Sequence, residues 1–153
     1  MLIDNAHSEL CLGEAGTMSP DMKGQHVALL EPGTKGGAAP LAHSLIVSAK
    51  LSNGMRPVRL KLDSGANVPF LYDPSLLDIP QGGKRPVAGS RYAALPAQTM
   101  KIGGVEVNHV SFITLAGAQK DKRTSDFDGL LTMGLFKRVF IDHVDHFAVL
   151  EAW

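Results

Sequence analysis

Asp63 is the residue whose type and surroundings are best suited to chemistry. Apolar and basic side chains alternate over residues 58–62, which is the period-two pattern of a half-buried strand. The acid follows this strand directly, and a second apolar run begins at Val68. Between the two runs lies a turn of small residues, Ser64, Gly65 and Ala66. Apolar side chains around a strand end disfavour the ionised form of a carboxyl. The end of this strand is therefore an unusual place for a charged residue.

Two interpretations of this turn are open from its residues alone. Asp-Ser-Gly is common turn chemistry, so Asp63 could simply belong to a surface turn. Alternatively, the two flanking strands hold the carboxyl in place for a reaction.

The stretch LKLDSGANVPFLY resembles the active-site turn of the retropepsin-like aspartic proteases, and in particular their bacterial members. A second segment, DGLLTMGLFKRVFIDHVDHFAVLEAW, follows in the order that this family shows. Between them, ALPAQTMKIGGVEVNHVSF resembles the strand region after the family's flap. The resemblance covers about residues 48–153.

The resemblance implies an aspartic endopeptidase in which Asp63 is the catalytic carboxylate. Ser64 takes the place of a family hydroxyl that ties two active-site turns together. Gly65 lets the backbone pass close to the acid and to the substrate, and Ala66 completes the turn. The chemistry needs two neighbouring carboxyls that share one proton, so that one polarises the peptide carbonyl and the other activates water.

This chain supplies one such turn. Asp128-Gly129 lacks the intervening Ser or Thr and precedes its apolar run, so it is a poor candidate for the second acid. The family implies a homodimer with one Asp from each subunit. A second source is a homologous lobe upstream, because MLIDNAHSELCL and FIDHVDHFAVL both place Ile-Asp before a polar turn with a histidine. Two ordinary hairpins would give the same pattern.

One feature departs from the family. The strand that braces the catalytic turn usually ends in two hydrophobic residues and Gly, whereas here Leu130-Leu131 precedes Thr132. This motivates an alternative function, a catalytically inactive protease-like β domain that binds peptides or a partner lobe. The family's flap would fall within residues 82–94. Apolar side chains that would line a substrate subsite, or simply belong to the core, are Leu62, Phe70 and Leu131.

Composition sets broad limits. A chain of 153 residues is long enough for one domain, and its formal net charge of zero gives no drive toward nucleic acid. Its apolar runs are too short to span a bilayer. Cys11, the single cysteine, would be either a buried small hydrophobic residue or a free thiol, and we expect burial. We expect no cofactor. His143 and His146 would not share a helical face, so we expect no metal site.

The expected architecture is mostly β, a small closed barrel or sandwich of the retropepsin-like type with one or two short helices. Residues 1–44 would form an N-terminal hairpin and a Gly/Pro-rich linker, and residues 45–153 the protease domain. Asp73-Pro74 predicts a helix start. A short helix is also predicted over residues 134–138, and a strand over residues 110–115. No signal peptide is visible, and an exported or periplasmic location would apply if the chain belongs to a longer protein.

Overall fold

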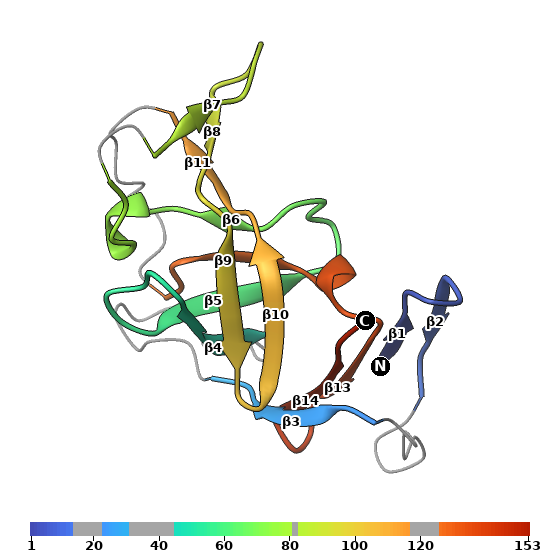
Figure 1. Cartoon of the computed structure of the whole chain (residues 1–153). Helices are drawn as coiled ribbons and strands as arrows, with labels where there is room; N and C mark the ends of the chain where they lie inside the picture. The colour runs from blue at the N-terminus through green and yellow to red at the C-terminus, as the bar shows by residue number, and fades with distance from the viewer. Residues whose placement is uncertain (14–22, 31–44, 81–82, 117–125) are drawn as a thin grey trace.

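The structure, a computed structural model, describes residues 1–13, 23–30, 45–80, 83–116 and 126–153 (Figure 1). The described residues are mostly strands, joined by short turns and two single-turn helices. The first strands are β1 (Leu2–Asp4), β2 (Glu9–Cys11), β3 (Gln25–Ala28), β4 (Ile46–Leu51), β5 (Val58–Asp63) and β6 (Phe70–Leu71). The later strands are β7 (Arg85–Pro86), β8 (Tyr92–Ala94), β9 (Gln98–Ile102), β10 (Val105–Val110), β11 (Ile113–Leu115), β12 (Gly129–Thr132), β13 (Arg138–Asp142) and β14 (Phe147–Glu151). The helices are η1 (Pro74–Leu76) and η2 (Met133–Leu135).

The strands form two sheets. The larger has the order β10-β9-β4-β5-β12-β6-β11-β8-β7, and the smaller has the order β2-β1-β13-β14-β3. The mostly β class is confirmed, but the closed barrel is wrong for the described residues. Each sheet stays open because its end strands, such as β10 and β7, pair with one neighbour only.

One hydrophobic core joins the two sheets. It takes alternate side chains from the strands of the large sheet, and β5 buries Val58, Leu60 and Leu62 as its alternation predicts. The small sheet adds Val27, Val139 and Ile141 to the same cluster. The core therefore lies directly beneath the strand that ends at Asp63.

The first 44 residues contribute strands to the small sheet. β1 pairs with β13, and β3 pairs with β14, so both flank the C-terminal hairpin. Most of the expected Gly/Pro-rich linker, residues 14–22 and 31–44, lies outside the described residues. The division at residues 44 and 45 stays a prediction.

Several local predictions can be compared with the structure. Asp73 caps η1 by accepting the backbone N–H of Ser75, as predicted. The second short helix lies slightly earlier than expected, at Met133–Leu135. The strand expected over residues 110–115 is split between the end of β10 and β11.

Cys11 is exposed, so the prediction of a buried cysteine is wrong. The cysteine lies in β2, an end strand of the small sheet whose residues are all exposed. A cysteine is buried only where a second layer covers its strand, and no described residue covers this one. Among the described residues, no helix has the length and apolar character needed to cross a membrane.

Candidate active site

Asp63 is the last residue of β5, a strand held between β4 and β12 in the interior of the large sheet. β12 runs parallel to β5, with Leu131 beside Leu62 and Thr132 beside Asp63. Leu62 and Leu131 are both almost fully buried. β12 therefore braces the backbone at Asp63, while β4 pairs with the same strand as far as Lys61. The Asp63 side chain is half-buried.

The turn after β5 brings the predicted residues together. The Gly65 N–H donates to Asp63 Oδ1 at 2.8 Å, which holds one carboxylate oxygen toward the turn. A Cβ on Gly65 would lie 3.3 Å from that same oxygen, a tight approach that the Asp63 side chain would have to relieve by a small shift. Ser64 is exposed and Ala66 is half-buried. The carboxylate is thus anchored by its own turn and remains partly open to solvent.

Gly129, at the start of β12, is a structural requirement of the site that the sequence did not reveal. A Cβ there would lie 2.1 Å from the carbonyl oxygen of Phe70, a distance that no side chain tolerates. β12 is squeezed between β5 and β6 at this residue, with Leu60 on one side and Leu71 on the other. Glycine lets the bracing strand enter between its neighbours.

Thr132, which follows Leu130-Leu131 in β12, is buried next to Asp63 in the strand register. Its hydroxyl accepts the N–H of Gly134 at 3.2 Å and caps η2. The Thr132 hydroxyl therefore stabilises the turn from β12 into η2.

Asp128 is an ion-pair partner in this structure. The Nη1 and Nη2 atoms of Arg56 donate to its two carboxylate oxygens at 2.9 and 2.7 Å, and the Arg59 N–H donates at 2.8 Å. Burial alone would raise the pKa of Asp128, but these hydrogen bonds and the positive charge of Arg56 lower it below 3.8. This agrees with the prediction that Asp128 is a poor second catalytic acid.

The surroundings of the site are partly core and partly aromatic. Leu62 and Leu131 belong to the hydrophobic core, which leaves Phe70 as the half-buried member of the three subsite candidates. The Phe70 ring lies 5.1 Å from that of Tyr72 and 6.1 Å from that of Tyr92, measured between centroids.

A hairpin forms in the region expected for the flap. β7 pairs antiparallel with β8, and the turn between them is exposed and includes Gly89 at φ 71°. Figure 1 shows this hairpin projecting from the rest of the large sheet, at the top of the view. Residues 81–82, which include one of the glycines of the expected flap, lie outside the described residues.

No group of three or more His, Cys, Asp or Glu side chains that could hold a metal ion occurs in the part of the chain that the structure describes. His143 and His146 lie in the turn between β13 and β14.

Comparisons with known proteins bear on the fold. No protein-family model matches the chain, and no curated protein sequence matches it. Among solved structures, the chain is similar to the crystal structure of a retropepsin-like aspartic protease from Rickettsia conorii, with a TM-score of 0.54. The matched residues are 18% identical, and the match covers 82% of this chain and 86% of the other. The chain therefore has a fold of the retropepsin-like type.

Proposed function

We propose that this chain supplies one catalytic carboxylate, Asp63, to an aspartic endopeptidase. The observation that carries the proposal is the position of Asp63 at the end of β5, braced by parallel β12 and anchored by the Gly65 N–H. The retropepsin-like fold of the chain supports the same reaction class.

The reaction needs a second aspartate close to Asp63. One carboxyl keeps the shared proton and polarises the carbonyl of the peptide bond, while the other is ionised and takes a proton from the attacking water. Two like charges at that distance cannot both ionise cheaply, so the pair titrates as a unit. We assign the second carboxyl to a partner, because Asp128 forms an ion pair with Arg56 within this chain. Ser64, exposed beside the acid, is then available to contact the partner's turn.

The test is cleavage of a diverse peptide mixture from acid to neutral pH by the natural polypeptide that contains this chain and its partner, with Asp63→Asn as the matched variant. We expect cleavage by the parent and none by Asp63→Asn, with equal thermal stability of the two. Cleavage that survives in the variant would overturn the assignment of Asp63.

The second candidate is a protease-like domain that binds peptides or a partner lobe without catalysis. The buried Thr132 beside Asp63, where the family usually has glycine, favours it. A folded parent that binds peptides from the mixture but cleaves none at any pH would support this candidate over the endopeptidase.

A further inference from the structure

The two hairpins of the small sheet are structural copies of each other. In β1 and β2, Leu2 pairs with Cys11 and Asp4 pairs with Glu9. Each residue of this hairpin corresponds to the residue 138 positions later in the chain (140 minus 2). In β13 and β14 the corresponding residues pair in the same way, Phe140 with Val149 and Asp142 with Phe147. The weak sequence repeat therefore corresponds to two hairpins of identical register.

The turns of the two hairpins also correspond. Asp4 Oδ1 accepts the N–H of His7 at 3.1 Å, and Asp142 Oδ1 accepts the N–H of Asp145, the equivalent residue, at 3.0 Å. One residue before the second strand, the backbone is left-handed in both turns, with φ 58° at Ser8 and 53° at His146. The two turns therefore share, at equivalent positions, a backbone conformation that non-glycine residues adopt infrequently.

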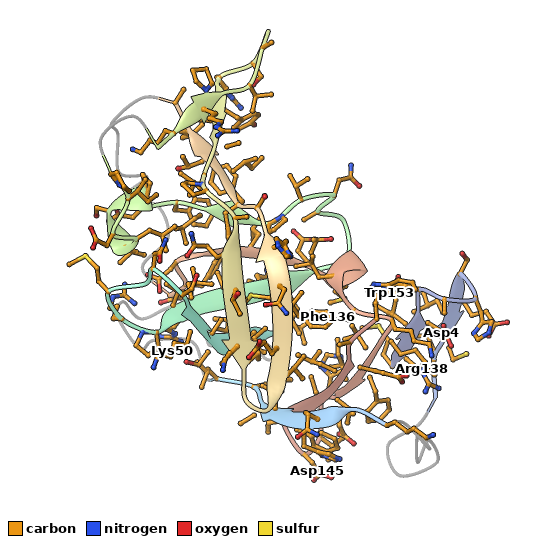
Figure 2. The ribbon with its side chains drawn as sticks, in the orientation of Figure 1. Asp4, Lys50, Phe136, Arg138, Asp145 and Trp153 are labelled. Atoms are coloured by element: carbon orange, nitrogen blue, oxygen red, sulfur yellow. The ribbon has the colours of Figure 1, made fainter. Side chains whose placement is uncertain are left out.

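A local two-fold axis relates the copies. β1 and β13 run antiparallel with Leu2 opposite Phe140, and these two residues are themselves equivalent. Met1 and Ile141 exchange both backbone hydrogen bonds, at 2.9 and 2.8 Å. Their equivalents across the axis, Ile3 and Val139, are likewise paired. Figure 2 shows the end of this contact, where Asp4 of β1 lies near Arg138 of β13.

The symmetry is broken at the outer edges of the sheet. The outer edge of β14 is covered by β3, whereas β2 pairs only with β1 among the described residues. Leu29, the residue after β3, donates its N–H to the His146 carbonyl at 2.9 Å. Because backbone groups alternate in direction along a strand, the N–H and C=O groups of Ala148 and Leu150 also point toward β3. Their equivalents on β2 and just after it, Leu10 and Leu12, are 62% and 77% exposed.

We propose that the outer edge of β2 is the docking surface for a strand equivalent to β3 that belongs to a second lobe of this same fold. β1–β2 would be the closing hairpin of that lobe, which would lie upstream in the same polypeptide. The two-fold axis would then place the lobe's active-site turn opposite Asp63, a step that rests on the proposed function. A second copy of the chain cannot form the same contact directly, because β1 occupies the edge of β13 that the copy would need.

The docking test uses the 153-residue chain and a synthetic peptide of residues 23–30, which contains β3, as a stand-in for the missing strand. We expect the peptide to slow amide exchange at Leu10 and Leu12 saturably. Leu10→Pro removes an outward N–H from an end strand that tolerates proline, and should weaken binding about fivefold to tenfold, the effect of one lost backbone hydrogen bond. Cys11→Ala, whose backbone faces β1, is the matched control and should bind like the parent.

Either of two results would overturn the proposal. One is the absence of any change at Leu10 and Leu12 at saturating peptide, or equal binding by Leu10→Pro. The other is self-association of the parent that Leu10→Pro suppresses, which would assign the edge to a second copy. Neither readout involves cleavage, so the outcome is independent of the Asp63 test.

The placement of β1 can be tested separately by a crosslink across the axis. In a Cys11→Ser background, Leu2→Cys with Phe140→Cys should form a disulfide within one chain, because opposed residues without mutual hydrogen bonds lie close enough. If that variant does not fold, Asp4→Cys with Arg138→Cys tests the next such pair. A disulfide between two chains would contradict the intramolecular two-fold.

Discussion

Two aspartates of this chain illustrate how position decides the use of a carboxyl. Asp63 ends a core strand, is half-buried and accepts the N–H of Gly65 in its own turn. Asp128 is clamped by Arg56 and by the backbone of Arg59. The turn around Asp63 could be predicted because its residues are adjacent in sequence. The Asp128–Arg56 pair could not, because 72 positions separate the two residues and only the fold brings them together.

Asp128→Asn is expected to lower the free energy of unfolding at neutral pH by about 1–3 kcal/mol, since it removes charge-assisted hydrogen bonds. The pKa of Asp128 is lowered in the folded state, so its stabilisation is present above about pH 3.8 and is lost as the pH falls through the folded-state pKa. The difference between parent and variant should therefore shrink in acid. Denaturant unfolding over this pH range measures it, and a difference that grows in acid would contradict the ion-pair role.

Gly129→Ala is expected to destabilise the fold by about 3 kcal/mol, at the upper end of overpacking costs, because its Cβ would meet the Phe70 carbonyl oxygen at 2.1 Å. The matched control is Gly134→Ala, whose Cβ would lie 3.5 Å from Thr132 Oγ1, an ordinary contact. Thermal unfolding of the two variants checks this. Equal stability of the pair would mean that β12 is not confined between β5 and β6 as described.

At the scale of elements, short-range signals were informative and pairings were not. The alternation in β5 and the Asp73-Pro74 start of η1 were both visible in the sequence. The pairing of β3 with β14 was not, because an isolated apolar stretch does not indicate its neighbour. Cys11 was wrongly expected to be buried for the same reason, since the exposure of β2 depends on its place at the end of a sheet.

The junction of β12 and η2 gives a prediction at this scale. Thr132→Val keeps the shape of the side chain but removes the hydroxyl that accepts the Gly134 N–H. We expect a loss of about 1 kcal/mol of stability, the usual effect of losing a helix cap. Thr132→Ser keeps the hydroxyl and should lose less. Chemical denaturation of both variants distinguishes them, and equal losses would show that the cap contributes nothing.

At the scale of the whole molecule, the mostly β class and the retropepsin-like fold followed from the order of the motifs along the chain. The arrangement in two open sheets did not, because barrel closure depends on how the end strands meet. The pseudo-symmetry of the small sheet could be predicted only in part. The sequence carried a faint repeat, and only strand register, turn contacts and backbone conformation made it specific.

The central claim is that Asp63 is a catalytic carboxylate and that the stability of the fold does not depend on it. Comparing Asp63→Asn with Asp128→Asn tests this claim most directly. Cleavage of the peptide mixture and thermal stability are measured for both variants of the natural polypeptide that contains this chain and its partner. The account predicts that Asp63→Asn abolishes cleavage at full stability, whereas Asp128→Asn keeps cleavage at reduced stability. Cleavage that persists in Asp63→Asn, or disappears only in Asp128→Asn, would contradict it.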